Sequence, residues 1–398
     1  MSEAPPSVQH PSVVRPAVVY FLLFGAVAAY FPYISVFFQS IGLSLAEIGL
    51  LAALNAAIAV VAAPLWGAVV DRARDVRGPL AVAGAWSALA AAWLAISREP
   101  IVVAIAVIVL AAGSAGLGPM LDSRTIQIVG ANRDRYGRAR AWGSLAFMAV
   151  ALGVGLLMDR TGPVGLFYVY APGLALTAIA AYLLLGRPRA SEPTVRRASA
   201  GFGQGLAGLA NDPTLLLFFI GSVLLWTAVA AVTTFLSIHL IDLGADSALV
   251  GLVWTPGALI EVPIMLAFPI ITRRVAADRL VFLGAVAFAV RAGIWAVIGD
   301  PWLFVLTAPL GGIGYAFFYV GTVTYVSRAA PASVQATAQG IFSGTAFSLG
   351  TILGSVIGGQ VAAGLTIPGL YAVSAVATGI AAVVVLQATE LRKSILRG

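Results

Sequence analysis

Long apolar segments of about 20 residues, the length that crosses a hydrocarbon core roughly 30 Å thick, alternate with short polar breaks along the whole chain. We count twelve, so the pattern predicts an all-α membrane protein with twelve transmembrane helices. Several spans contain proline, which predicts kinks, because neighbouring helices can satisfy the backbone groups that proline frees. The expected spans are residues 16–38, 45–70, 79–97, 101–122, 141–157, 164–185, 213–240, 248–271, 280–298, 303–326, 334–361 and 367–388, and the prolines are Pro32, Pro64, Pro119, Pro256, Pro263 and Pro309.

The basic residues predict how the chain lies in the membrane. Of the 23 basic residues, 20 fall on one side of the twelve spans, whereas the opposite loops hold only Arg98 and Arg160, and Arg291 lies inside a span. Basic loops are cytoplasmic in membrane proteins, so both termini are expected in the cytoplasm and the chain in the inner membrane. The 20 are Arg15, Arg72, Arg74, Arg77, Arg124, Arg133, Arg135, Arg138, Arg140, Arg187, Arg189, Arg196, Arg197, Arg273, Arg274, Arg279, Arg328, Arg392, Lys393 and Arg397.

The longest polar break divides the spans six and six, and it predicts two six-helix halves joined by a cytoplasmic linker. The expected division is a tail at residues 1–15, a first half at 16–186, the linker at 187–211, a second half at 212–388 and a tail at 389–398. The tail before the first span lacks a cleavable signal pattern, so that span is expected to be retained.

The two halves also resemble one another. Residues Gly42 to Gly49 are similar to Gly244 to Gly251, and an Ala-Phe pair at 146–147 recurs at 346–347. The two offsets agree, which indicates duplication, and duplicated six-span halves are typical of transporters whose site lies between them near the membrane midplane. The alternative is that small residues recur in membrane helices simply because they allow close packing.

Composition narrows the functional class. The chain is 60% hydrophobic and 10% charged, against roughly 25% charged residues in soluble domains, and its net charge of +7 lies in the loops expected to be cytoplasmic, so nucleic-acid binding is not expected. There is no cysteine, and the histidines are His10 and His239, which excludes thiolate and histidine-rich metal centres. No nucleophile with an adjacent base is visible, so neither an enzyme nor a cofactor is expected. His239 is expected at the membrane interface.

The loop after the second expected span carries a recognisable motif. Gly67 is followed four positions later by Asp71 and then by Arg72, with more basic residues up to Arg77. This run resembles the signature loop of the major facilitator superfamily, although that family usually has a second glycine where this chain has Arg74. The resemblance implies that Asp71 and Arg72 belong to a cytoplasmic gate whose contacts break as the halves rock. The alternative is a pair of solvated loop charges.

Two charged residues are expected near mid-depth in the membrane, where a charge costs several kcal/mol. Glu261 lies within the eighth expected span and Arg291 within the ninth. Each should face a cavity or the bundle interior, and pairing between them is plausible. A carboxylate that is separated from its arginine by a conformational change can take up a proton, so the two are candidates for proton coupling. A static buried ion pair is the alternative.

A second acid and arginine, Asp122 and Arg140, lie 18 residues apart at the expected fourth and fifth spans. With the run from Tyr136 to Ser144, they resemble the lactose permease and its relatives within the major facilitator superfamily, in which an acid and an arginine at this separation hold the substrate. The resemblance extends to the Ala-Tyr-Phe-Pro run at 29–32 and implies substrate contacts for Asp122, Arg140, Phe147 and Tyr30.

The chain departs from the permease at five positions. Gly311 and Gly314 replace its histidine and glutamate of the tenth span, Phe347 its lysine, Phe147 its stacking tryptophan and Ala258 its carboxylate of the eighth span. A galactoside site is therefore not expected. Proton coupling would have to run through Asp122 or through Glu261, which lies one helical turn from Ala258. The whole pattern is similar to the branch that includes phenylpropionate transporters and nucleoside–proton symporters.

These observations predict a secondary transporter that works by alternating access as a proton-coupled symporter. It is expected to import a small organic solute, which could be an aromatic acid, a nucleoside or an oligosaccharide. A proton-driven exporter and a facilitative uniporter on the same fold remain alternatives. The expected partners are the solute, protons and the lipid bilayer, and the resemblance implies a monomer.

Overall fold

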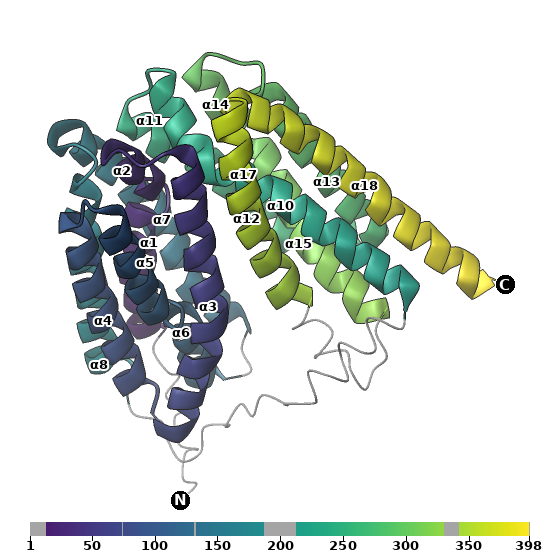
Figure 1. The fold of residues 1–398 in the computed structure, drawn as a ribbon. Helices are drawn as coiled ribbons and strands as arrows, with labels where there is room; N and C mark the ends of the chain where they lie inside the picture. The colour runs from purple at the N-terminus through teal and green to yellow at the C-terminus, as the bar shows by residue number, and fades with distance from the viewer. Residues whose placement is uncertain (1–12, 74, 131–132, 187–211, 330–341, 398) are drawn as a thin grey trace, which may run out of the picture.

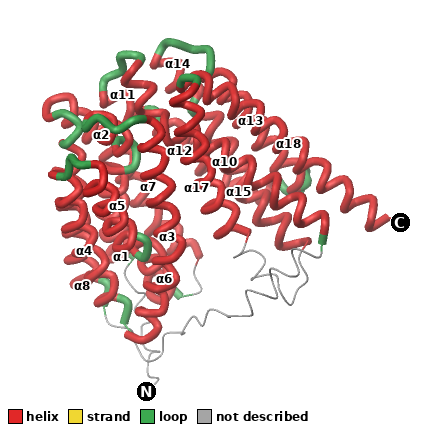
Figure 2. The backbone as a smooth tube through the Cα atoms, viewed as in Figure 1, coloured by secondary structure: helices red, strands yellow, loops and turns green. Residues whose placement is uncertain are grey.

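The computed structural model describes residues 13–73, 75–130, 133–186, 212–329 and 342–397. This part of the chain is helical and contains no strand (Figures 1 and 2). The predicted linker at 187–211 and Arg74 lie outside it. The helices are α1 Val14–Tyr30, α2 Ile34–Ser40, α3 Leu45–Ala73, α4 Arg77–Ile96, α5 Pro100–Ser114, α6 Leu117–Val129, α7 Arg133–Thr161, α8 Gly165–Leu184, α10 Pro213–Asp242, α11 Ser247–Leu252, α12 Trp254–Ile271, α13 Ala277–Trp295, α14 Pro301–Thr307, α15 Pro309–Ala329, the π-helix η1 Phe342–Ala346, α17 Phe347–Gly364 and α18 Ile367–Arg397.

The predicted all-α membrane protein is confirmed. Within the described residues, 11 helical segments are long and apolar enough to cross a membrane, several of them made of two consecutive helices. The helix α13 is the twelfth, and its 19 residues include Asp278, Arg279 and Arg291. These three charges lower the hydropathy of α13, although it packs inside the bundle against α15 and α18. The protein is therefore a multi-pass membrane protein.

Proline interrupts some spans and not others. The chain turns between α1 and α2 at Pro32, and α15 begins at Pro309. By contrast, Pro64 lies inside the continuous helix α3. Proline removes one backbone donor and crowds the preceding turn, and at Pro32 and Pro309 the predicted irregularities lie next to the central cavity described below.

The helices form two groups that meet at one end. Helices α1 to α8 pack mainly against one another, as do α10 to α18, and the two groups touch chiefly through α3 with α17 and α7 with α11 (Figure 1). The groups approach each other at the top of Figure 1 and diverge toward the bottom of the view. We call these the closed end and the open end.

The predicted repeat is confirmed at the turns that lead into α3 and α11. Gly42 has a φ of +90° and Gly244, 202 positions later, has a φ of +86°. This left-handed conformation is strained for other residues and suits glycine. Each turn ends in a helix cap, because Ser44 and Glu47 cap each other's backbone N–H groups and the Asp246 carboxylate accepts from the N–H of Leu249 at 2.8 Å. The two halves therefore use the same local structure at the closed end.

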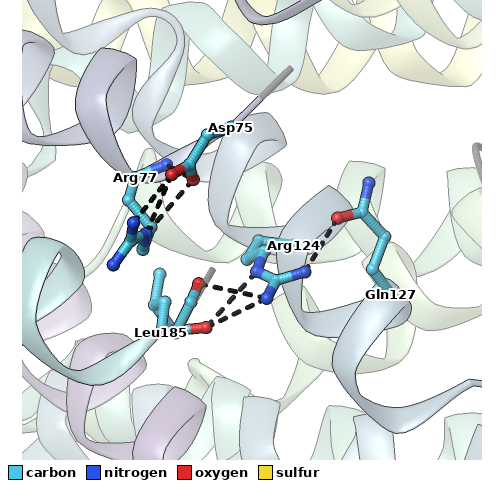
Figure 3. Close-up of polar contacts among 6 residues, drawn as sticks. Asp75, Arg77, Arg124, Gln127 and Leu185 are labelled. Atoms are coloured by element: carbon cyan, nitrogen blue, oxygen red, sulfur yellow. Dashed lines mark hydrogen bonds and ion pairs between the residues drawn. The ribbon is translucent and has the colours of Figure 1, made fainter. Parts of the chain in front are cut away.

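A buried arginine fixes the open end of the first half (Figure 3). The Arg124 side chain is 1% exposed and donates to the carbonyls of Leu185 at 3.2 Å and Gly186 at 3.1 Å. It also donates to the Gln127 side chain at 3.1 Å. The last carbonyls of α8 have no partner within the helix, so Arg124 both caps α8 and ties it to α6.

Candidate functional site

A cavity of about 540 Å³ lies between the two groups of helices. Side chains of α1, α2, α3, α5 and α7 line it from the first half, and those of α10, α12, α13, α15 and α17 line it from the second. Its volume lies within the range of roughly 300 to 1,000 Å³ that is typical of small-molecule sites. The predicted placement of a site between the halves agrees with this cavity.

Glu261 and Arg291 both line this cavity and are its charged residues. No hydrogen bond or ion pair joins them in the described part of the chain, so the structure does not contain the pair that the sequence suggested. The Arg291 guanidinium lies 4.5 Å from the centre of the Trp295 ring and 5.2 Å from that of Phe288, and its buried Nε has no hydrogen-bond partner. A buried guanidinium without an acceptor is costly, so Arg291 presents unused donors to the cavity.

Two glycines of α15, Gly311 and Gly314, occupy positions at which the permease has larger side chains. A Cβ atom at Gly311 would collide with Nη1 of Arg291 and lie 3.1 Å from its Cζ. A Cβ atom at Gly314 would lie 3.0 Å from the Phe288 ring. A larger residue at Gly311 would displace the Arg291 side chain, and one at Gly314 would press on the Phe288 ring. The placement of Arg291 in the cavity therefore depends on Gly311.

The predicted substrate residues Asp122 and Arg140 lie outside the cavity. Asp122 accepts hydrogen bonds from the hydroxyl groups of Tyr20 at 2.5 Å and Tyr136 at 3.1 Å. The Arg140 guanidinium lies 3.7 Å from the centre of the Phe24 ring. Among the residues described, no direct contact joins Asp122 to Arg140.

Arg140 and Glu261 belong to opposite halves of the protein. Arg140 lies on α7 of the first half, and Glu261 lies on α12 of the second half, directly after α11. Near the closed end α7 and α11 touch, since a Cβ atom at Gly251 would lie 2.5 Å from the carbonyl oxygen of Ala151. Arg140 lies eleven residues before Ala151 on α7, and Glu261 lies ten residues after Gly251. At about 1.5 Å per helical residue, each charge lies roughly 15 Å from this contact toward the open end. The two charges therefore lie at similar depth, one on each half.

The aromatic predictions fall on the cavity. Tyr30 and Phe147 both line it, and Tyr30 stacks on Tyr170 with ring centres 4.6 Å apart. The indole Nε1 of Trp254, which also lines the cavity, is buried and has no hydrogen-bond partner. Trp226 differs, because its Nε1 donates to the Thr351 hydroxyl at 3.0 Å.

Polar contacts join the two halves at the closed end of the cavity, and none of them was predicted from the sequence. The Tyr33 hydroxyl donates to the carbonyl of Ala151 at 2.6 Å and lies 3.1 Å from that of Ser247. The Ser247 N–H donates to the Asp159 carboxylate at 2.8 Å, and Gln39 donates to Asp242 at 3.3 Å. Only the repeated Gly-x₆-Gly segment could have indicated these contacts.

Glycine backbones complete the closed end. A Cβ atom at Gly155 would collide with the carbonyl oxygen of Ser247 and lie 2.6 Å from the Cα of Ala248. In the other pair of helices, a Cβ atom at Gly359 would lie 2.8 Å from the carbonyl oxygen of Leu45. Such approaches are possible only without side chains, so the closed end is a backbone-to-backbone seal.

The predicted gate residues Asp71 and Arg72 are exposed at the open end of α3. The hydrogen bond recorded for Arg72 runs within its own helix, to the carbonyl of Ala68 at 3.5 Å. In the part of the chain that the structure describes, no hydrogen bond or ion pair joins either side chain to the other half. No group of three His, Asp or Glu side chains suited to a metal ion occurs among the described residues.

The cavity lies between two groups of membrane-spanning helices and is closed at one end by contacts between the groups. This arrangement is typical of a secondary transporter. The chain belongs to the MFS_1 like family, whose model matches residues 13–367. Membership makes the protein a transporter of small organic solutes rather than an enzyme.

Known relatives are permeases. The chain is 28% identical to the maltose permease of Geobacillus stearothermophilus over 368 residues, which is 92% of each chain. It is 24% identical to the xanthosine permease of Escherichia coli (strain K12) over 235 residues, 56% of each. The crystal structure of the nucleoside transporter NupG superposes with a TM-score of 0.83 at 18% identity, covering 95% of this chain and 98% of that one. The fold is thus that of a major facilitator transporter.

Proposed function

We propose that this protein is a proton-coupled symporter that imports a neutral hydroxylated solute, an oligosaccharide or a nucleoside, by alternating access. The observation that carries the proposal is that Glu261 and Arg291 line the central cavity without a bond to each other. The cell inner membrane and cytoplasmic termini follow from the distribution of basic residues. One chain forms the whole cavity, which supports a monomer as the working unit.

The cavity favours a neutral ligand over the aromatic acid that the sequence left open. One carboxylate and one guanidinium line it, so their formal charges balance. Trp254 offers an unused indole N–H, and the rings of Trp226 and Tyr315 supply apolar faces. Hydroxyl groups can donate to Glu261 and accept from Arg291, and a flat ring can pack on the aromatic faces. The named substrates of the relatives, maltose and xanthosine, have this chemistry.

Glu261 is the proposed proton carrier. It lies in the cavity, at a depth similar to that of Arg140 on the opposite half. When the halves rock, the distance to Arg140 and the access to water both change, and each alters the balance between the protonated and the charged carboxyl group. The proton would thus be bound in one conformation and released in the other.

The proposal assigns the open end to the cytoplasm, so the conformation described faces inward. Closure of this end would bring α3 toward the second half, where Asp71 and Arg72 would act as the cytoplasmic gate. Arg140 would then approach Glu261 and the substrate, whereas Asp122 would act through its bonds with Tyr20 and Tyr136.

The test measures external pH in lightly buffered, de-energised cells that express the protein. Maltose-type oligosaccharides, nucleosides and phenylpropionate are added in turn, beside Glu261→Gln and a control variant, Glu99→Gln, whose side chain is exposed before α5. Alkalinisation by one class of solute, absent in Glu261→Gln and intact in Glu99→Gln, supports symport on Glu261. Uptake without a pH change would contradict proton coupling, and efflux without uptake would contradict import.

A further inference from the structure

Three buried polar atoms without partners cluster in the second half, between the cavity and the closed end. They are Nε2 of His239, the hydroxyl of Tyr371 and Nε of Arg291. His239 is 5% exposed and Tyr371 is fully buried. A buried polar atom without a partner is unfavourable, so three in one cluster call for a functional explanation.

Aromatic contacts hold this cluster together. The His239 and Tyr371 rings meet edge to face with centres 5.3 Å apart. Trp295 packs against Tyr371 with ring centres 6.1 Å apart. The Arg291 guanidinium carbon lies 4.5 Å from the centre of the Trp295 ring. The three polar groups therefore come from α10, α18 and α13, and the rings of Tyr371 and Trp295 connect His239 to Arg291.

The cluster connects two functional parts of the molecule. At one end, Arg291 and Trp295 line the central cavity. At the other end, Asp242 lies one helical turn from His239 and accepts the hydrogen bond from Gln39 that joins the two halves. His239 therefore lies one turn from a contact that must break when the closed end opens.

We propose that His239 is a proton-binding site that the closed end seals, and that Tyr371 links it through ordered water to Arg291 in the cavity. A buried water needs two to four polar partners, and His239, Tyr371 and Arg291 each have a buried polar atom without one. The inference rests on the proposed function in that it adds an entry site for the coupled proton.

The direction of the effect follows from charge and burial. In the sealed site, imidazolium would carry an Nε2 hydrogen without an acceptor, and burial disfavours the charged form. Opening the closed end releases Asp242 from Gln39 and admits water, so the charged form gains partners. The titratable and charged groups around His239 are Asp242 on its own helix, Tyr371 on α18 and, beyond it, Arg291 on α13. Protonation should therefore favour opening toward the outside.

The test uses the absence of native cysteine. A single cysteine replaces Ser35, which lines the cavity and is 7% exposed, and a membrane-impermeant maleimide is added outside intact cells between pH 8 and 5.5. The labelling rate is divided by that of Gly299→Cys, in an exposed loop at the closed end, to remove the intrinsic pH dependence of the thiol. The expected result is a several-fold rise as pH falls, which disappears in His239→Gln.

Two tyrosine variants test the link to the cavity. Tyr371→Phe removes only the hydroxyl group and should blunt the rise, whereas Tyr325→Phe removes another unpartnered buried hydroxyl of the same half and should preserve it. A flat profile in the parent, a retained rise in His239→Gln or an unchanged rise in Tyr371→Phe would overturn the proposal. Substrate counterflow confirms that each variant is folded. A normal pH-dependent profile without substrate-driven alkalinisation would refute symport while leaving the His239 site intact.

Discussion

Gly49 and Gly251 occupy equivalent positions in the two halves and make the same contact. A side chain at Gly49 would collide with the carbonyl oxygen of Ser355, and one at Gly251 would lie 2.5 Å from that of Ala151. The two glycines are 202 positions apart, which is also the spacing of the positive-φ glycines Gly42 and Gly244. The closed end is therefore a pair of matching seals, one on each side of the cavity.

We expect Gly155→Leu to prevent closure of this end. Its side chain would have to occupy the space of Ser247 and Ala248, and overpacking of this kind costs roughly 1 to 3 kcal/mol. Because about 1.4 kcal/mol is a tenfold change, external maleimide labelling of Ser35→Cys should rise about tenfold. The matched control is Gly153→Leu, two residues away on the same helix, where a Cβ atom meets nothing within 4 Å. Equal labelling of the two variants would show that the glycine contact does not seal the cavity.

Gly311→Ala should weaken substrate binding without unfolding the protein. The added methyl group must displace the Arg291 guanidinium, which then leaves its place beside Trp295. Loss of one hydrogen bond to a charged group, worth about 1.5 to 3 kcal/mol, would raise the Kd roughly tenfold or more. The measurement is substrate binding to purified protein, with Gly379→Ala as control, since a Cβ atom there meets nothing within 4 Å. An unchanged affinity would remove Arg291 from the binding site.

Arg124→Gln should lower the thermal stability of the first half. The variant leaves the Leu185 and Gly186 carbonyls in a buried position without their donor, and we expect a loss of about 1 to 3 kcal/mol in the free energy of unfolding. The control is Arg160→Gln, whose side chain is exposed at the end of α7. Melting temperatures in detergent compare the two. Similar values would mean that Arg124 contributes no more than a surface arginine.

Asp75 should make the thermal stability of the protein depend on pH. Partial burial raises the pKa of Asp75, but the hydrogen bonds from the Arg77 side chain and backbone outweigh burial and hold the pKa below its usual value. A depressed pKa in the folded state means that its stabilisation is present above the unfolded value, about 3.9, and is lost as pH falls through the folded value. Asp75→Asn should therefore melt at a lower temperature than the parent at pH 6, and the two should converge toward pH 3. A constant difference across this range would contradict the assignment.

The sequence by itself determined the number of spans, the repeat and which charged residues lie within the membrane. Length and hydropathy suffice for spans, because a helix in lipid must satisfy its own backbone and be long enough to cross. The cost of a charge in the membrane likewise identified Glu261 and Arg291, and both line the cavity. The glycines of the repeat were visible as letters, but their role as a seal was not.

Only the tertiary structure decided which groups face one another. Helical spacing placed Glu261 and Arg291 at similar depth, but it could not show that Arg291 lies on Trp295 or that Arg140 lies on the Phe24 ring. Hydropathy likewise placed His239 near a helix end, whereas packing buried it against Tyr371. Rotation of each helix about its axis and the pairing between halves depend on side-chain packing between segments about 200 residues apart, and a periodic pattern within one segment carries no information about that packing.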